Sequence, residues 1–140
     1  MIHDKPLPAG IERRLDTLGA LLSDCPGVVF AYVFGGAGAG RITPLSDVDV
    51  AVYLEAGQDA AERHASLLQD VTAHLGTDEV DLIVLNSAPT ALLGRILQAR
   101  RVIVDRVPFL RHQFESRALR EFFDFRVFER RLLDRRYGNG

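Results

Sequence analysis

Three aspartates stand in or beside apolar, strand-like stretches of this 140-residue chain. Asp47 and Asp49 are two residues apart at the start of Asp47–Leu54, so the alternation of a strand places both side chains on one side of a sheet. Two like charges this close raise a pKa unless a cation lies between them, and Mg²⁺ is the usual companion of carboxylates that act on phosphates. The pair therefore indicates a divalent-metal site or, alternatively, a turn-capping Asp47 beside a solvated Asp49.

Asp81 is a third carboxylate in an apolar setting. It stands inside the otherwise apolar run Val80–Leu85, where burying a carboxylate without a partner or a metal ion would be costly. If the strand that contains Asp81 is a neighbour of the one that begins at Asp47, the three carboxylates converge on one spot. That convergence favours the metal site over the alternative.

A glycine-rich segment, Gly35–Gly40, separates an apolar strand from the acidic pair. Backbone N–H groups next to glycine can approach a phosphate without obstruction by side chains, so we expect a loop suited to phosphate contact. Gly35 and Gly40 have the spacing of a P-loop, but Arg41 and Ile42 stand where Lys and Ser/Thr are required. The glycines do not fit the dinucleotide-binding fingerprint either. Neither motif identifies the ligand.

Hydrophobic periodicity and turn residues divide the chain into alternating helices and strands. Helices are expected from Ile11 until Pro26, from Gln58 to Leu75, from Thr90 to Gln98 and over the C-terminal segment, with strands at Val28–Phe34, Asp47–Leu54, Glu79–Leu85 and Val102–Val104. The second helix is expected to bury Ala61, Ala65, Leu68, Val71 or Thr72, and Leu75. In this order, helices and strands alternate along the whole chain.

The composition is that of one ordinary globular domain spanning residues 1–140, with 47% hydrophobic and 26% charged residues. The net charge of -2 argues against a surface that binds nucleic acid non-specifically. The single cysteine, Cys25, excludes an intramolecular disulfide, and neither a signal sequence nor a membrane-spanning apolar run is visible. We therefore expect a cytoplasmic protein with no membrane association.

The long C-terminal helix contains six of the eight phenylalanines and ends in two arginine pairs. Its apolar stripe consists of Phe114, Ala118, Phe122, Phe125 and Leu132, and Leu119, Phe123 and Val127 widen the stripe beyond one face. A helix packed on the sheet explains this pattern. Alternatively, the wide stripe and its flanking arginines dock a partner protein or a second copy of the chain.

Phe34-Gly35-Gly36, ten intervening residues and Asp47-Val48-Asp49 resemble the Gly-Ser, ten-residue, Asp-x-Asp signature of DNA-polymerase-beta-like nucleotidyltransferases. Asp81 resembles the third carboxylate of that family. The short length, the stretch Leu85–Pro89 and the long C-terminal helix look closest to the minimal nucleotidyltransferases, or MNT proteins, which are encoded beside HEPN-domain proteins as toxin–antitoxin pairs. The resemblance covers nearly the whole chain.

The resemblance implies a polymerase-beta-like nucleotidyltransferase fold, which is an α/β (α+β) fold with a small mixed sheet flanked by helices and a long C-terminal helix. It also implies the transfer of AMP from ATP. Asp47, Asp49 and Asp81 would be the catalytic and metal-binding residues, holding two Mg²⁺ ions, and Asp81 would take or orient the proton of the incoming hydroxyl. Gly35, Gly36 and Ser46 would contact the nucleotide. The implied acceptor is a tyrosine hydroxyl of a HEPN toxin, which the modification would silence.

Gly36 departs from the family pattern because it stands where the family has a serine, and Ala37 stands where an arginine is often found. The backbone amide remains but the serine contact is lost, and a hydrogen bond to a charged oxygen is worth about 1.5–3 kcal/mol. Two other functions stay open. One is a small-molecule adenylyltransferase similar to the aminoglycoside-modifying enzymes, and the other is a catalytically weak antitoxin that neutralises its partner by binding alone.

Overall fold

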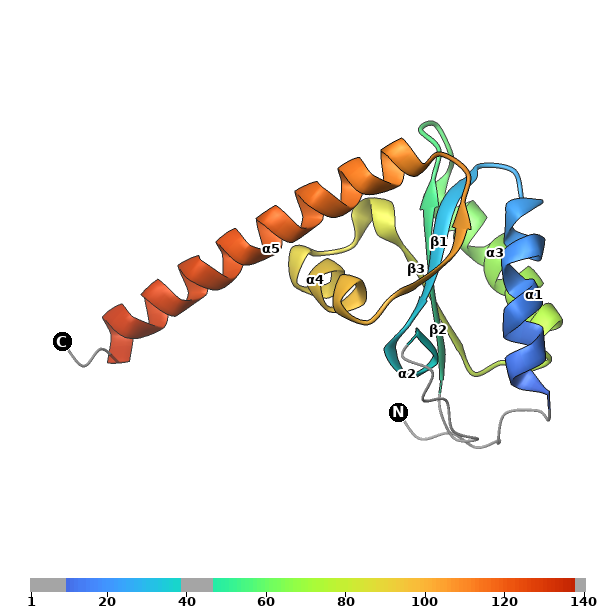
Figure 1. Ribbon diagram of the computed structural model, residues 1–140, viewed down its shortest axis with the longest axis horizontal. Helices are drawn as coiled ribbons and strands as arrows, with labels where there is room; N and C mark the ends of the chain where they lie inside the picture. The colour runs from blue at the N-terminus through green and yellow to red at the C-terminus, as the bar shows by residue number, and fades with distance from the viewer. Residues whose placement is uncertain (1–9, 39–46, 138–140) are drawn as a thin grey trace.

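The computed structural model describes residues 10–38 and 47–137. These residues form three layers, in which a four-stranded sheet lies between two groups of helices (Figure 1). The elements in chain order are α1 (Ile11–Ser23), β1 (Val28–Phe34), α2 (Gly35–Gly38), β2 (Val48–Leu54), α3 (Ala60–Leu75), β3 (Val80–Val84), the 3-10 turn η1 (Leu85–Ser87), α4 (Thr90–Gln98), β4 (Arg101–Asp105) and α5 (Pro108–Tyr137). The predicted α/β fold with a long C-terminal helix is confirmed.

The sheet has the strand order β3-β2-β1-β4. Strand β1 is antiparallel to both of its neighbours, β2 and β4, whereas β2 and β3 are parallel. The parallel pair arises because α3 crosses from the end of β2 back to the start of β3, as parallel neighbours require. The two acidic strands are therefore neighbours, which is the condition under which the three aspartates are expected to converge.

Strand β1 forms the centre of the core, and six of its seven residues are buried. One face of the sheet packs against α1 and α3 through aliphatic side chains such as Leu18, Leu22 and Leu67. The other face packs against α4 and the start of α5, around Phe30 and Tyr32. Because both faces are covered, β1 reads in the sequence as an uninterrupted apolar run rather than as an alternating one.

Helix α3 buries only part of the stripe that the sequence predicts: Leu68 packs partly buried against the core, but the two alanines do not. Leu67, Val71 and Leu75 are buried, whereas Ala61 and Ala65 are exposed. Burying a leucine removes far more apolar area from water than burying an alanine, so the helix is rotated to favour its larger side chains. The helix begins at Ala60 because the side chain of Asp59 accepts a hydrogen bond from the Glu62 N–H at 3.1 Å.

The glycine-rich segment is also more regular than predicted. Its first four residues form the single helical turn α2 directly after β1, where the sequence indicates only a loop. Gly35 begins this turn with φ +63°, a conformation that residues with a Cβ atom adopt only at a cost.

Helix α5 is packed on the domain only along its first half. Its 30 residues make it about 45 Å long, and Figure 1 shows it leaving the sheet and α4 and projecting away from them. Ala118 and Phe122 are buried, but Phe125 and Leu132 are exposed. The expectation that the whole apolar stripe packs on the sheet is therefore wrong beyond Phe122.

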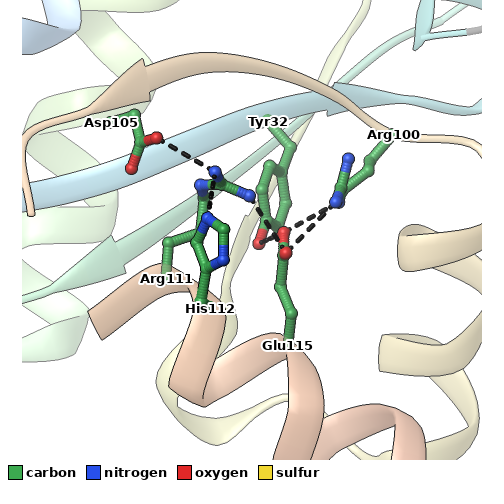
Figure 2. A network of polar contacts seen from close by, with 6 residues as sticks. All are labelled: Tyr32, Arg100, Asp105, Arg111, His112 and Glu115. Carbon is green, nitrogen blue, oxygen red and sulfur yellow. Dashed lines mark hydrogen bonds and ion pairs between the residues drawn. The ribbon is translucent and has the colours of Figure 1, made fainter. Parts of the chain in front are cut away.

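Glu115 anchors the first half of α5 to the sheet (Figure 2). Its carboxylate accepts a hydrogen bond from the Tyr32 hydroxyl at 2.7 Å and is paired with Arg100 at 2.8 Å and with Arg111 at 3.0 Å. Arg111 also contacts Asp105 in β4 at 3.1 Å. Burial and the bond to Glu115 raise the pKa of Tyr32 above its usual value, so the hydroxyl stays protonated and continues to donate.

No helix within residues 10–38 and 47–137 is long and apolar enough to cross a membrane.

Candidate active site

Asp49 and Asp81 are direct partners in the parallel register of β2 and β3. Residues paired in this way direct their side chains to the same face of the sheet. Asp49 shares that face with Ala51, which packs in the cluster beneath α4. Asp47 stands just before β2, two residues from Asp49. The structure thus brings the three predicted carboxylates to one end of one face.

The electrostatics of Asp49 reflect this crowding. Burial raises its pKa to about 6, and the nearby carboxylates of Asp81 and Asp47 add to the increase. Ordinary aspartates titrate near 3.9, so the protonated form of Asp49 is unusually favoured. Both desolvation and repulsion by the neighbouring carboxylates disfavour the charged form of Asp49. A bound cation would offset these two unfavourable effects.

Asp81 differs from the sequence expectation in one respect. Its residue is exposed rather than buried, because it lies near the start of the edge strand β3. Asp81 is therefore not a buried carboxylate that requires a partner or a metal ion. The position in register with Asp49 is what brings Asp81 into the site.

Gly35 closes the site from the side of β1. The last residue of β1, Phe34, pairs with Asp49 across the antiparallel ladder, and the chain then turns at Gly35 into α2. A Cβ atom added to Gly35 would lie 2.5 Å from Oδ2 of Asp49. The turn that the sequence links to phosphate binding therefore contacts the half-buried carboxylate directly.

Of the other two residues predicted to contact a nucleotide, the structure describes only Gly36. Gly36 lies within α2, next to Gly35. Ser46 lies outside the described residues, as does the rest of the segment 39–46. Sequence reasoning missed the contact between Gly35 and Asp49, because nothing in the local pattern relates a residue at the end of one strand to a side chain on the next.

The described residues contain no three His, Cys, Asp or Glu side chains arranged to hold a metal ion as they stand. The chemistry of the donors nevertheless fits Mg²⁺, which takes carboxylate oxygens and keeps several of its own water molecules. The pKa of Asp49, raised in part by the neighbouring carboxylates, is a second observation in favour of that fit, since a cation between them would relieve the repulsion.

Asn86, just after β3, has a structural role at the far end of β2. Its side-chain amide donates to the Leu54 carbonyl and accepts from the Leu54 N–H, both at 2.9 Å. A pocket of about 280 Å³ lies beside it, lined by residues that include Tyr53, Arg117 and Glu121. This pocket is at the opposite end of β2 from the carboxylates, so it is separate from the candidate active site.

The model of the family described as "Polymerase beta, Nucleotidyltransferase" matches residues 16–108. The chain belongs to this nucleotidyltransferase family. The matched range includes the glycine turn, Asp47, Asp49 and Asp81.

One curated relative in sequence is a bifunctional uridylyltransferase/uridylyl-removing enzyme from Burkholderia lata, which is 29% identical over 129 residues. The match covers 83% of this chain but only 15% of that enzyme. The nucleotidyltransferase domain described here thus corresponds to a small part of the larger protein.

Two solved structures are similar in fold. A chain from the complex of a tri-AMPylated Shewanella oneidensis HEPN toxin with an MNT antitoxin has a TM-score of 0.67 and 21% identity, covering 89% of this chain and 96% of that one. A chain from a toxin–antitoxin complex with AMP-PNP has a TM-score of 0.70 and 21% identity, covering 86% of this chain and 95% of that one. At these identities the likeness establishes the fold.

Proposed function

We propose that this nucleotidyltransferase transfers AMP from ATP to a tyrosine hydroxyl of a HEPN-domain partner and so acts as its antitoxin. The observation that carries the proposal is the in-register pair of Asp49 and Asp81 beside the Gly35 turn. Family membership supports the reaction class. The fold shared with chains of toxin–antitoxin complexes, one with an AMPylated HEPN toxin and one with AMP-PNP, supports the donor and the partner.

Asp47, Asp49 and Asp81 are the proposed ligands of two Mg²⁺ ions. When bound, these ions would neutralise charge on the phosphates and align the attacking and leaving oxygens. The half-buried Asp49 provides a carboxylate whose orientation is fixed by β2 and by contact with Gly35. Gly35 and Gly36 offer backbone N–H groups at the start of α2, and Ser46 is the third proposed nucleotide contact.

Asp81 is the proposed group that orients or deprotonates the incoming hydroxyl. Two observations favour an acceptor as large as a protein. Asp81 is exposed, and it lies on β3, the edge strand of the sheet, so a bulky partner can approach it without displacing another strand. A base that is accessible at an edge suits the side chain of a docked protein better than it suits a small molecule enclosed in a pocket.

The Burkholderia lata relative favours a second candidate function, the transfer of UMP instead of AMP. The carboxylates and the glycine turn act on the phosphates and do not distinguish between nucleotide bases. Both reactions use the same proposed site and differ only in the donor and in the mass added to the acceptor.

The test is intact-mass spectrometry of a HEPN protein encoded beside this chain, after incubation with the chain, Mg²⁺ and either ATP or UTP. We expect the partner's mass to rise by whole AMP units with ATP, and Asp49→Asn and Asp81→Asn to abolish the increase while complex formation persists. Asp70→Asn, at an exposed position in α3, is the matched control and should retain activity.

A rise by UMP units with UTP alone would replace the first candidate by the second. If the partner's mass stays unchanged while the wild type and both aspartate variants relieve toxicity equally, the protein acts by binding and the transferase proposal is wrong.

A further inference from the structure

The distal segment of α5, Phe123–Tyr137, exposes large apolar side chains without a partner in the described part of the chain. Phe123 is 56% exposed, Phe128 64% and Tyr137 71%. Figure 1 shows this segment extending beyond α4 and the sheet. Scattered apolar residues on a surface need no explanation, but several on consecutive turns of one projecting helix form a contiguous patch of the kind that marks an interaction site.

The exposed patch continues a seam that is already packed within the domain. Phe122 lies against Gly94 of α4, where a Cβ atom would collide with its ring, so the two helices approach each other closely at this point. Phe125 and Leu132 follow on the same face of α5, at positions 3 and 10 residues beyond Phe122. The helix therefore presents the same apolar stripe twice, first to its own domain and then to solvent.

Charge is divided along this part of α5. The stretch 123–129 carries Asp124 and Glu129, with Arg126 as its only cation, and Glu121 stands just before it. The stretch 130–137 carries four arginines and one carboxylate, Asp134. One end of the exposed segment is thus acidic and the other end is basic.

We propose that the distal segment of α5 pairs with the same segment of a second copy of this chain, in antiparallel orientation. An antiparallel pair places the acidic stretch of each copy beside the basic stretch of the other, whereas a parallel pair would place like charges together. It also sets the two helix dipoles in opposition. The contact is isologous and closes with two-fold symmetry, so it forms a dimer and not a fibre.

The length of the segment sets the expected strength of the dimer. About 15 residues span roughly 22 Å, so the contact is smaller than the standard interface of about 800 Å² per partner. Association is therefore expected at micromolar concentrations and should weaken as salt screens the charges. The active-site strands lie far from this segment (Figure 1), so dimerisation leaves the proposed site accessible.

The test is sedimentation equilibrium of the full chain without any partner protein. The wild type is expected to dimerise, and Glu121→Arg with Asp124→Arg is expected to raise the dimer Kd by about tenfold or more. Arg135→Glu with Arg136→Glu should do the same. An equimolar mixture of the two variants should regain the dimer as a heterodimer. Glu12→Arg, at an exposed position in α1, is the control and should associate like the wild type.

Orientation is tested by disulfide formation from single added cysteines. Glu129→Cys lies near the centre of an antiparallel pair and should link the two copies, whereas Tyr137→Cys lies at one end and should not. Folding of each variant is checked by circular dichroism and by its melting temperature.

Three results would overturn the proposal. The first is a wild-type chain that stays monomeric at several hundred micromolar. If such a chain associates only when a HEPN protein is added, the exposed surface of α5 binds that protein instead of a second copy. The second is a dimer whose Kd is unchanged in both charge-reversal variants. The third is a dimer that links through Tyr137→Cys, because only a parallel pair places the two copies of residue 137 side by side.

Discussion

Oδ2 of Asp49 lies 2.5 Å from the point that a Cβ atom on Gly35 would occupy. No other residue type fits at position 35 unless the carboxylate moves. The positive φ of Gly35 adds a second, independent reason for glycine. The glycine turn and the half-buried aspartate are therefore one structural unit, although 13 residues separate them in sequence.

Gly35→Ala is expected to impair both stability and activity. The positive φ alone costs about 1–2 kcal/mol for a residue with a Cβ atom, and the new methyl group must also displace the Asp49 carboxylate. Gly57→Ala is the matched control, because Gly57 has φ +88° and open space around its Cβ position. Chemical unfolding should show a loss in both variants, but nucleotide binding should fall only in Gly35→Ala. Equal nucleotide affinities would contradict the contact.

Asp49 should make stability depend on pH. Its folded-state pKa, about 6, is above the unfolded value, so the folded protein binds this proton more tightly than the unfolded protein does. The ionised Asp49 therefore lowers the stability of the folded state most at pH values above 6. As pH falls from about 7 to about 4, its contribution to stability increases. Asp49→Asn should therefore be more stable than the wild type at pH 7.5 without divalent ions, and the difference should vanish near pH 4.

Urea unfolding at both pH values measures this difference. Asp81→Asn removes one of the causes of the raised Asp49 pKa, so it should shift the transition toward lower pH without abolishing it. If the stability of Asp49→Asn depends on pH in the same way as that of the wild type, another group is responsible for the pH dependence.

Mg²⁺ together with ATP should raise the melting temperature of the wild type. A ligand that binds only the folded state at 100 times its Kd stabilises that state by about 2.7 kcal/mol. The double variant Asp47→Asn, Asp49→Asn should lose most of the shift in differential scanning fluorimetry, whereas Asp124→Asn should keep it. The same shift in the double variant would place the nucleotide elsewhere.

Gly36→Ser should strengthen nucleotide binding. Gly36 is not among the positive-φ glycines of the described residues, so a side chain is compatible with its backbone. A regained hydroxyl contact to a phosphate oxygen is worth about 1.5–3 kcal/mol, or about 10- to 100-fold in Kd. Calorimetric titration with a non-hydrolysable ATP analogue tests this, with Ala37→Ser as the control that places the same hydroxyl one residue further on. An unchanged Kd would mean that the side chain at 36 does not face the phosphates.

Glu115→Gln should destabilise the attachment of α5 to the sheet. The substitution leaves Arg100 and Arg111 facing a neutral amide at a position where Glu115 is buried, and losing one partner of a buried ion pair costs about 3 kcal/mol. The same substitution at the exposed Glu62 should cost little. Thermal unfolding of both variants decides, and equal losses would mean that the network around Glu115 is not stabilising.

The strands and the positions of Asp47 and Asp49 could be predicted because they depend on local patterns. The run Val28–Phe34 is apolar throughout because both faces of β1 are covered. The two-residue spacing of Asp47 and Asp49 places both side chains on the same side of a strand. The adjacency of Asp81 followed from assuming that the two acidic strands are neighbours, which the parallel register confirms.

The rest depends on tertiary contacts that no local pattern contains. The buried side of α3 follows from packing against α1 and the sheet, so the prediction was wrong for Ala61 and Ala65, whereas Val71 and Leu75 are buried as predicted. Glu115 resembles any helical surface glutamate in the sequence, and only the fold brings Tyr32, Arg100 and Arg111 to it. Similarly, Phe114 and Phe125 occupy the same stripe, yet only the first half of α5 has a surface to pack on.

The position of β4 beside β1 has a consequence for synthesis on the ribosome. β1 emerges early, but the strand that pairs with its second edge is formed by residues 101–105. Until those residues leave the exit tunnel, the nascent chain has a long apolar strand with an open edge, which is a site for mispairing with other chains. The sheet is therefore completed late, after the strands that carry Asp49 and Asp81 have been made. Glu115, which attaches α5 to the sheet through Tyr32, follows ten residues after the end of β4.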